Sequence, residues 1–481
     1  MNAIFKDLYP HDLWYYFDEI CKIPRPSKHE DKITDWLINF GKEQNLEVKK
    51  DAAGNVLISK PGTAGREKEK PVILQSHVDM VGEKNNHKSH DFFSDPIVPV
   101  RDGEWIKADG TTLGADDGIG MAAQLAILAA DDISHGPLEC LFTVDEETGL
   151  TGAFNLEEGF FEGRTLINLD SEDEGELFIG CAGGIDTVAH FRPVYEEVPS
   201  GYTALEIEVS GLKGGHSGDD IHKGLGNANK ILVRYLWKIA KEYNFRLAYI
   251  QGGNLRNAIA REAKAVGVVP SKYKEEVRVA LNLLSHDVEQ ELRFTDPDVK
   301  MKLGSTDQPS GVFLQEFQNN LLNALYACPH GVMGWSHEIN GLVETSTNLA
   351  SIKNENEEII VSTSQRSSVE SARDDLANMI NCVFDLAGAE VKHSDGYPGW
   401  KPDLNSPVLD RAIASYEKLF GKKPDVKAIH AGLECGLFLQ KYPDMDMISM
   451  GPTIKGAHSP DERLHIKSVS RFWDHLIDML K

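Results

Sequence analysis

Short runs of apolar residues, each followed by a polar cluster, recur in the first part of the chain and again near its end. Residues 71–75, 138–144, 165–169 and 445–450 have the length and composition of buried strands. The segment 118–130 between them has a helical pattern, as the crossover between two parallel strands would. We therefore predict an α/β fold whose mixed, mostly parallel sheet is flanked by helices on both faces.

The N-terminal segment shows a possible helix start. Ser27-Lys28-His29-Glu30 has the form of a capping box, and apolar residues follow it at helical spacing. This pattern predicts an amphipathic helix from about 28 to 44. Residues 55–59 then read as a strand.

From about residue 187 to residue 392 the pattern changes. Residues 204–209 alternate between apolar and polar, as in a half-exposed strand, and 227–243 and 368–387 have the pattern of amphipathic helices packed on one side of such strands. A chain of 481 residues is also long for a single core. We predict a catalytic domain made of 1–186 and 393–481, and an inserted α+β lid domain at 187–392.

Composition narrows the classes of partner. The chain has 50 Lys and Arg against 75 Asp and Glu, and its net charge of −25 disfavours nucleic acid and anionic membranes as partners. There is no signal-like start and no apolar run near the roughly 18 residues of a membrane span. The 6 cysteines are scattered, without a CxxC pair. These features predict a cytoplasmic protein with reduced cysteines.

The polar residues after the predicted strands could bind metal. In open α/β sheets, ligands bind beyond the carboxyl ends of the strands, and histidine nitrogens and carboxylate oxygens suit zinc. Each of two ions could take one histidine, one terminal carboxylate and one oxygen of a shared Asp116, which leaves a position open for water. The candidate ligands are His77, Asp116, Glu147, Asp170 and His458.

Each of these residues alone would more often be an ordinary surface or strand-end side chain, so the combination carries the prediction. Competing motifs fail. Residues 114–120, GADDGIG, lack the spacing of a dinucleotide-binding loop, and 215–219, GHSGD, lack the last glycine of a serine-hydrolase elbow.

Five blocks of the chain follow the order of a known family. They read SHVDMV (76–81), LGADDGIG (113–120), DEETGL (145–150), NLD (168–170) and GAHSPDE (456–462). Over essentially its whole length the chain resembles the two-zinc metallopeptidases, which include carboxypeptidases, aminoacylases, succinyl-diaminopimelate desuccinylase and dipeptidases. Within this family, KGGHSG (213–218) and NAIAREA (257–263) are most similar to bacterial dipeptidases that cleave Xaa-His peptides.

The resemblance assigns roles around the metals. It implies that His77 and Asp170 hold one zinc, that Glu147 and His458 hold the other, and that Asp116 bridges them. It also implies that Asp79 orients His77, that Glu146 is the general base, and that the peptide bond between Asp116 and Asp117 is cis. Cobalt or manganese could occupy the same ligands.

The resemblance further implies substrate contacts in the insert at His216, Asn257 and Arg366, and a fourth at Gly432. Catalysis would then require the domains to close, and a homodimer could form through the lid. The expected substrate is a small peptide, above all an Xaa-His dipeptide such as β-alanyl-histidine. A tripeptidase, an N-acyl amino-acid amidohydrolase and a zinc-binding protein without activity remain as alternatives.

Overall fold

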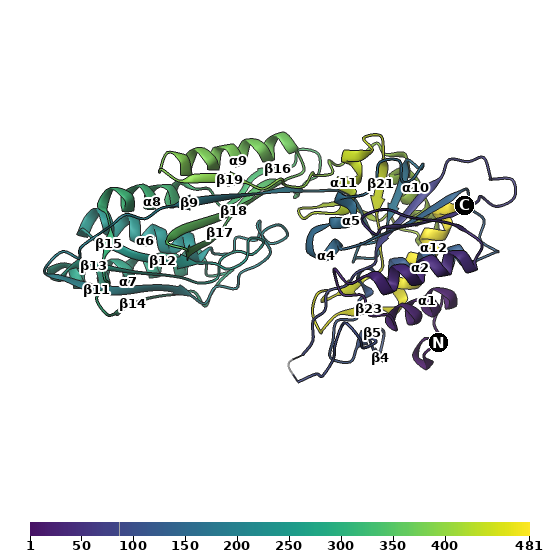
Figure 1. Cartoon of the computed structure of the whole chain (residues 1–481), viewed down its shortest axis with the longest axis horizontal. Coiled ribbons are helices and arrows are strands. Elements are labelled where there is room, and N and C mark those ends of the chain that lie inside the picture. The colour runs from purple at the N-terminus through teal and green to yellow at the C-terminus, as the bar shows by residue number, and fades with distance from the viewer. Residues whose placement is uncertain (86) are drawn as a thin grey trace. The chain divides into compact units, whose positions relative to one another are not determined.

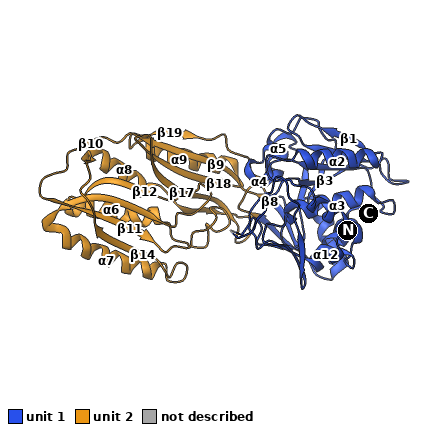
Figure 2. Ribbon diagram, turned by 60° about the horizontal axis from the view of Figure 1, so that its bottom comes forward, with its two compact units in different colours: residues 1–180, 402–428, 433–481 blue, residues 181–401, 429–432 orange. Residues whose placement is uncertain are grey.

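The computed structural model describes residues 1–85 and 87–481, and it divides the chain into two compact units (Figure 2). Unit 1 comprises Met1–Gly180, Pro402–Ala428 and Leu433–Lys481, and unit 2 comprises Cys181–Lys401 and Ile429–Gly432. In the part of the chain that is described, no helix combines the length and the hydrophobicity needed to cross a membrane.

The boundaries between the two units differ from residues 186 and 392, where the sequence pattern changes. Strand β9 (Gly183–Phe191) pairs with strands of unit 2. The loop before Pro402 returns to the same region, because Trp400 pairs with Cys181 and Tyr397 with Gly184. Residues 429–432 also join unit 2, where Ala182 N–H donates to the carbonyl oxygens of Ile429 and Ala431.

The main sheet of unit 1 is mixed, with a parallel centre. Strands β6, β3, β7 and β21 run parallel to their neighbours in that group, while β1, β2 and β8 pair antiparallel. In sheet order the strands are β1 (Glu47–Lys50), β2 (Val56–Lys60), β6 (Leu138–Thr143), β3 (Val72–His77), β7 (Thr165–Asn168), β21 (Asp446–Ser449), β8 (Glu176–Cys181) and β20 (Asp425–Ile429). The predicted strands are therefore confirmed within one or two residues.

Helices flank this sheet, and a small antiparallel sheet accompanies it (Figure 1). The predicted crossover helix is α3, which packs on α1 and β3 and buries nearly all of its side chains. The helices are η1 (Ala3–Phe5), α1 (His11–Cys21), α2 (Asp31–Glu43), α3 (Ala115–Ala129), α4 (Glu146–Gly149), α5 (Thr151–Phe154), α10 (Pro407–Phe420), α11 (Glu434–Lys441) and α12 (Ile466–Leu480). The small sheet has the order β22 (Ile454–Lys455), β23 (Arg463–His465), β5 (Trp105–Ala108) and β4 (Pro99–Asp102).

The capping-box prediction was wrong. Helix α2 begins at Asp31 and not near residue 28, and its first turn has no side-chain cap. The Glu30 carboxylate accepts a hydrogen bond from Lys28 N–H instead, and the Ser27 side chain bonds to Asp79. A tertiary contact next to the candidate metal site therefore outweighs the local capping pattern.

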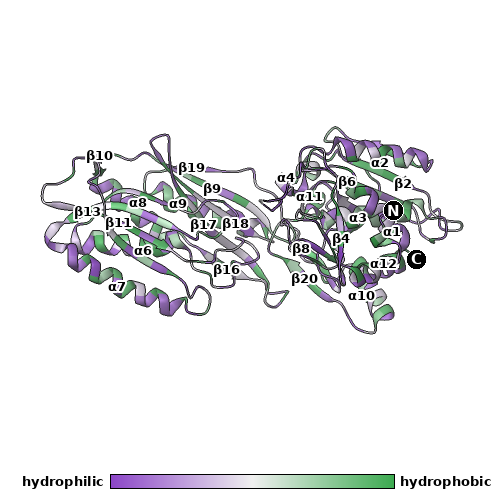
Figure 3. Cartoon of the chain, turned by 90° about the horizontal axis from the view of Figure 1, so that it is seen from below, coloured by the Kyte–Doolittle hydropathy of each residue, from purple (hydrophilic) through white to green (hydrophobic). Residues whose placement is uncertain are grey.

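Unit 2 is an antiparallel sheet with helices packed on one face, as predicted. The core of unit 2 lies between that face and the long helices. Its helix residues include Leu232, Leu281, Leu322 and Ile380. Helix α7 carries hydrophilic and hydrophobic residues on the same ribbon (Figure 3), as expected of a helix with one buried face.

The strands of unit 2, in sheet order, are β14 (Lys300–Ser305), β11 (Tyr202–Ser210), β13 (Ala263–Pro270), β12 (Arg246–Gly252), β17 (Val343–Glu355), β18 (Glu358–Ser367), β9 and β19 (Glu390–His393), with β16 (Gly331–Trp335) beside β17. Strands β10 (Tyr195–Glu196) and β15 (Val312–Phe313) form a separate pair. The helices are α6 (Ala228–Tyr243), η2 (Ser271–Tyr273), α7 (Lys274–Glu291), α8 (Gln315–Ala327) and α9 (Glu370–Asp385).

Candidate metal centre and associated polar cluster

The ends of three parallel strands carry candidate ligands. His77 is the last residue of β3, Asp170 follows β7 by two residues, and Glu146 and Glu147 open the short helix α4 after β6. Because β6, β3 and β7 are adjacent and parallel, their carboxyl ends meet at one edge of the sheet. The sequence prediction placed these residues at that edge.

Asp116 lies between two histidines. Its Oδ1 is 3.1 Å from His77 Nε2, and its Oδ2 is 3.1 Å from His458 Nε2. Asp116 and Asp117 have non-helical backbone angles at the start of α3, and the peptide bond between them is cis, as the resemblance implied.

Two overlapping groups share Asp116. In the first, His77 Nε2 is 3.4 Å from Asp170 Oδ1, and in the second, His458 Nε2 is 2.9 Å from Glu147 Oε2. Within each group the ligand atoms all lie within 4.8 Å of one another. The five predicted ligands therefore come together in unit 1, in the pairs that the resemblance implied.

This donor set fits zinc. Two ligand atoms about 2.0–2.1 Å from one tetrahedral ion would be roughly 3.3 Å apart, which is close to the nitrogen–oxygen separations in both groups. Imidazole nitrogens and carboxylate oxygens are ligands that zinc accepts. In addition, Glu147 Oε1 is buried without a hydrogen-bond partner within the described residues.

The charges of the site depend on each other. Burial lowers the pKa of His77, but the neighbouring carboxylates, Asp170 first among them, raise it well above its usual value. Hydrogen bonds to Asp116 and Glu147 raise the pKa of His458 to about 11. Burial in turn raises the pKa of Asp170 and of Glu147. Buried carboxylates crowded in this way around two imidazoles favour divalent cations.

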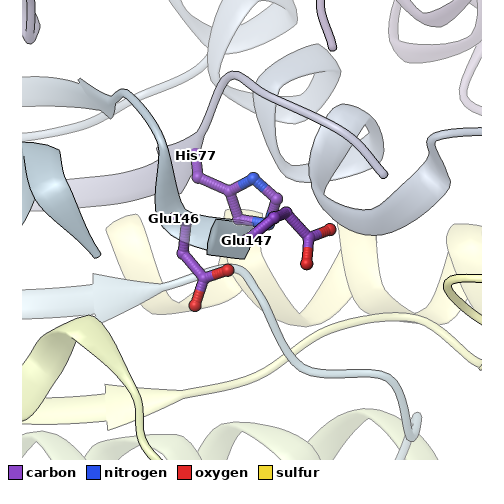
Figure 4. Close-up of side chains that lie close together, drawn as sticks. All are labelled: His77, Glu146 and Glu147. Carbon is purple, nitrogen blue, oxygen red and sulfur yellow. The ribbon is translucent and has the colours of Figure 1, made fainter. Parts of the chain in front are cut away.

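Asp79 organises both His77 and the start of α4, where Glu146 and Glu147 lie close to His77 (Figure 4). The backbone N–H groups of Glu146 and Glu147 donate to its two oxygens at 3.0 and 3.3 Å, and its Oδ1 lies 3.3 Å from His77 Nδ1. The Glu146 side chain lies beside His77 and Glu147, and burial raises its pKa well above the usual range. A carboxylate with a raised pKa can accept and return a proton near neutral pH.

The sequence reading missed Glu434, a buried residue that opens α11. Its Oε2 accepts hydrogen bonds from Gln75 Nε2 at 2.7 Å and Thr143 Oγ1 at 2.8 Å, and burial raises its pKa to about 7. Gln75 lies two residues before His77 and therefore on the same face of β3. The polar residues inside otherwise apolar strands were the available signal.

In unit 2, the two ring nitrogens of His216 differ in their surroundings. The backbone N–H groups of Gly218 and Asp219 point at its Nδ1 at 3.3 and 3.2 Å, and the Asp219 carboxylate lies 3.4 Å from the same nitrogen. Asn257 lies beside it, because Ser217 N–H donates to the Asn257 carbonyl oxygen at 2.8 Å. Nε2 takes part in none of these contacts.

Arg366 and Gly432 meet at Tyr397, which the sequence analysis did not single out. Arg366 Nη1 donates to the Tyr397 hydroxyl at 2.8 Å, and its Nε is buried without a hydrogen-bond partner in the described chain. A Cβ on Gly432 would lie 2.9 Å from the Tyr397 ring. The loop that carries Gly432 also reaches His216, since a Cβ on Gly218 would lie 2.2 Å from the His430 carbonyl oxygen. The four predicted substrate residues therefore belong to one region of unit 2.

Comparison with known proteins gives a consistent family assignment. The sequence model of "Peptidase family M20/M25/M40" matches residues 73–480. The "Cytosol non-specific dipeptidase" of Escherichia coli (strain K12) is 45% identical over 474 residues, which are 98% of this chain and 98% of that protein.

Solved structures give the same picture. The aminoacylhistidine dipeptidase from Vibrio alginolyticus matches with a TM-score of 0.91 and 46% identity, covering 99% of this chain and 97% of that one. A tripeptidase from Staphylococcus aureus matches with a TM-score of 0.58 at 18% identity, covering 98% of each chain, and therefore shares the fold.

Proposed function

Because this chain belongs to peptidase family M20/M25/M40, we propose that it is a dipeptidase whose metal centre holds two zinc ions. The observation that carries the proposal is the split of the two Asp116 oxygens between His77 and His458. Asp170 would complete the ligands of the first ion, and Glu147 those of the second. Cobalt or manganese are alternatives for the same donors.

Glu146 is the general base of this proposal. When bound, the two ions would acidify a water molecule and polarise the substrate carbonyl. Glu146 takes a proton from the attacking water and returns it to the leaving amine nitrogen. Asp79 keeps Glu146 in place through the backbone hydrogen bond to Glu146 N–H.

The groups of unit 2 supply substrate recognition in this proposal. His216 donates its Nε2–H to the oxygen that becomes negative in the transition state. Arg366 and Asn257 bind the terminal carboxylate, for which the planar guanidinium is well suited. Gly432 leaves room beside Tyr397, where a side chain would collide with the ring.

Acidic residues beside the metal centre would receive the free amine of the substrate in this proposal, and recognition of both charged ends would restrict the substrate to free dipeptides. An added residue or a blocked end would leave a charged group of the protein unpaired. The Xaa-His preference, including β-alanyl-histidine, rests on the name of the Vibrio alginolyticus relative, whereas the Escherichia coli relative is called non-specific. We also propose a cytoplasmic location, because the Escherichia coli relative is named as a cytosol dipeptidase. The homodimer through the lid stays a prediction.

The test compares substrates that differ at one end. Metal-loaded protein is assayed with a dipeptide, its C-terminal amide, its N-acetyl form, a tripeptide and a tetrapeptide, and with alanyl-histidine and β-alanyl-histidine against alanyl-alanine. We expect the free dipeptide to be cleaved at least tenfold faster than the amide and the tetrapeptide. Equal cleavage of the tetrapeptide would refute two-ended recognition, and faster cleavage of a tripeptide or of the N-acetyl form would favour a tripeptidase or an amidohydrolase.

A further inference from the structure

A buried carboxylate holds the loop that leads to the bridging aspartate. Glu462 is 2% exposed and accepts hydrogen bonds from consecutive backbone N–H groups. Leu113 N and Gly114 N lie 2.6 and 2.9 Å from its Oε2, and Ala115 N and Asp116 N lie 2.7 and 3.4 Å from its Oε1. Both of its oxygens therefore bind the backbone that positions Asp116.

Glu462 also ends the loop that carries His458. The loop folds on itself, because Ser459 Oγ donates to the Gly456 carbonyl oxygen at 2.7 Å and Glu462 N–H donates to the Ser459 carbonyl oxygen at 3.0 Å. Within it, His458 has a φ of +61°, an uncommon value for a residue other than glycine. Such a conformation needs the surroundings to hold it.

Arg25 binds the same loop through a carbonyl oxygen. Its Nη2 donates to the Gly114 carbonyl at 2.5 Å, while its Nη1 donates to the carbonyl oxygens of Val78 at 2.8 Å and Asp79 at 2.6 Å. Arg25 is 2% exposed. It therefore ties the segment that follows His77 to the segment that precedes Asp116.

Two glycines of the LGADDGIG block make room for this guanidinium. A Cβ on Gly114 would lie 2.8 Å from Arg25 Nη2, and a Cβ on Gly118 would lie 2.6 Å from the same atom. Gly114 also has a φ of +67°. The glycines of this block thus serve the close approach of Arg25.

We propose that Glu462 and Arg25 form a clamp that positions Asp116, His458 and His77 for metal binding, with Glu462 as the residue that sets metal affinity. The clamp acts through backbone groups and supplies none of the proposed metal ligands, so both are positioning residues. Hydrogen-bonded partners of metal ligands typically contribute about 10- to 100-fold to metal affinity or activity. This inference rests on the proposed metal centre.

A matched control exists in the same unit. Glu139 is also buried, at 6% exposure, and accepts hydrogen bonds from Glu162 N and Gly163 N at 2.7–3.1 Å. It lies near the start of β6, opposite Ile73 of β3, and thus at the other end of the strands from the ligands. Replacing either glutamate by glutamine removes a buried negative charge that accepts hydrogen bonds from the backbone N–H groups of a loop.

The experiment titrates zinc into metal-free protein in competition with a chromogenic chelator. Wild type, Glu462→Gln, Glu462→Asp and Glu139→Gln are compared, and the melting temperature of each metal-free protein is recorded. We expect Glu462→Gln to weaken the binding of at least one ion by about 10- to 100-fold. Glu462→Asp, which keeps the charge, should recover part of that loss. Glu139→Gln should keep wild-type zinc affinity even if its melting temperature falls as far as that of Glu462→Gln.

The possible results are distinct. Wild-type zinc affinity in Glu462→Gln, with a lowered melting temperature only, would overturn the clamp and leave a purely structural role. An equal loss of affinity in Glu139→Gln would overturn it as well. If Glu462→Gln does not fold, Glu462→Asp decides, since wild-type affinity there would contradict the proposal. Failure of the wild-type protein to bind zinc would instead refute the proposed metal centre.

Discussion

In unit 1, His77, Glu147 and Asp170 follow the ends of buried parallel strands, whereas in unit 2 the functional candidates lie on strand β18 and on loops tied together by long-range hydrogen bonds. The ligand groups of unit 1 touch each other directly, as when Asp116 joins His77 and His458. In unit 2, Arg366 meets Gly432 through the ring of Tyr397. Substitutions in the unit 1 cluster should therefore slow the chemical step, whereas substitutions in the unit 2 cluster should weaken substrate recognition.

The largest expected effect is at Glu146. Glu146→Gln should lower kcat by about 10²- to 10⁴-fold, because the proton acceptor is lost. Asp79 still accepts the backbone N–H of residue 146, so every ligand stays in place. Metal analysis beside steady-state kinetics checks both halves, with Glu139→Gln as the control for loss of a buried carboxylate. Substantial turnover with full metal content would remove Glu146 from its assigned role.

The second effect belongs to unit 2. Arg366→Lys keeps the charge but loses the planar fork, so kcat/KM for a free dipeptide should fall about 10- to 100-fold, mainly through KM. Cleavage of the C-terminal amide should change little. Arg373→Lys is the control, because Arg373 donates to the Tyr397 carbonyl oxygen rather than to its hydroxyl. An equal loss for dipeptide and amide would contradict carboxylate recognition by Arg366.

A third contrast concerns pH. Burial lowers the pKa of His330, in unit 2, to about 4, whereas an unfolded histidine has a pKa of about 6.5. Between these values the unfolded state binds the extra proton, so stability is lost as pH falls from about 6.5 to 4, at up to about 1.4 kcal/mol per pH unit.

Denaturant unfolding across this pH window tests the effect. His330→Asn keeps an acceptor for the Leu349 N–H but removes the titration, and should flatten the slope for unfolding of unit 2. His286→Asn, at an exposed position, is the control and should keep the wild-type slope. An unchanged slope in His330→Asn would assign the acid sensitivity to other groups.

The sequence predicted the strands of unit 1 and the ligands after them, because His77, Glu147 and Asp170 each follow a contiguous apolar run. Local pattern and function coincide there. It could not predict Glu462, Arg25 or Glu434, whose partners are far away in the chain, as Leu113 is from Glu462. Sequence order does not reveal which carboxylate will meet a backbone loop some 350 residues away.

The prediction of where α2 begins was wrong for the same reason, since the partner that matters is distant in the chain. Ser27 and Glu30 have the types and spacing of a local cap, but the fold uses Ser27 to bond Asp79. In unit 2, Tyr397 stands in a loop without any periodic pattern, so nothing local marked it as the residue against which Arg366 and Gly432 pack.

The smallest expected effect separates positioning from contact inside unit 2. Tyr397→Phe keeps the ring between Gly184 and Gly432 but removes the hydroxyl that accepts from Arg366 Nη1. Burial raises the pKa of Tyr397, so the hydroxyl is neutral at working pH and its loss should cost about 1 kcal/mol. We expect a several-fold lower kcat/KM for the free dipeptide, expressed in KM, with metal content unchanged.

The double variant decides how Tyr397 acts. If it acts by orienting Arg366, Tyr397→Phe should have little further effect in the Arg366→Lys background, because the two changes remove one interaction. Tyr442→Phe, which removes a hydroxyl bonded to Gly159 N–H in unit 1, is the matched control and should leave KM unchanged. Fully additive losses in the double variant would mean that Tyr397 contributes to recognition independently of Arg366, and the contrast between direct contact in unit 1 and indirect support in unit 2 would not hold.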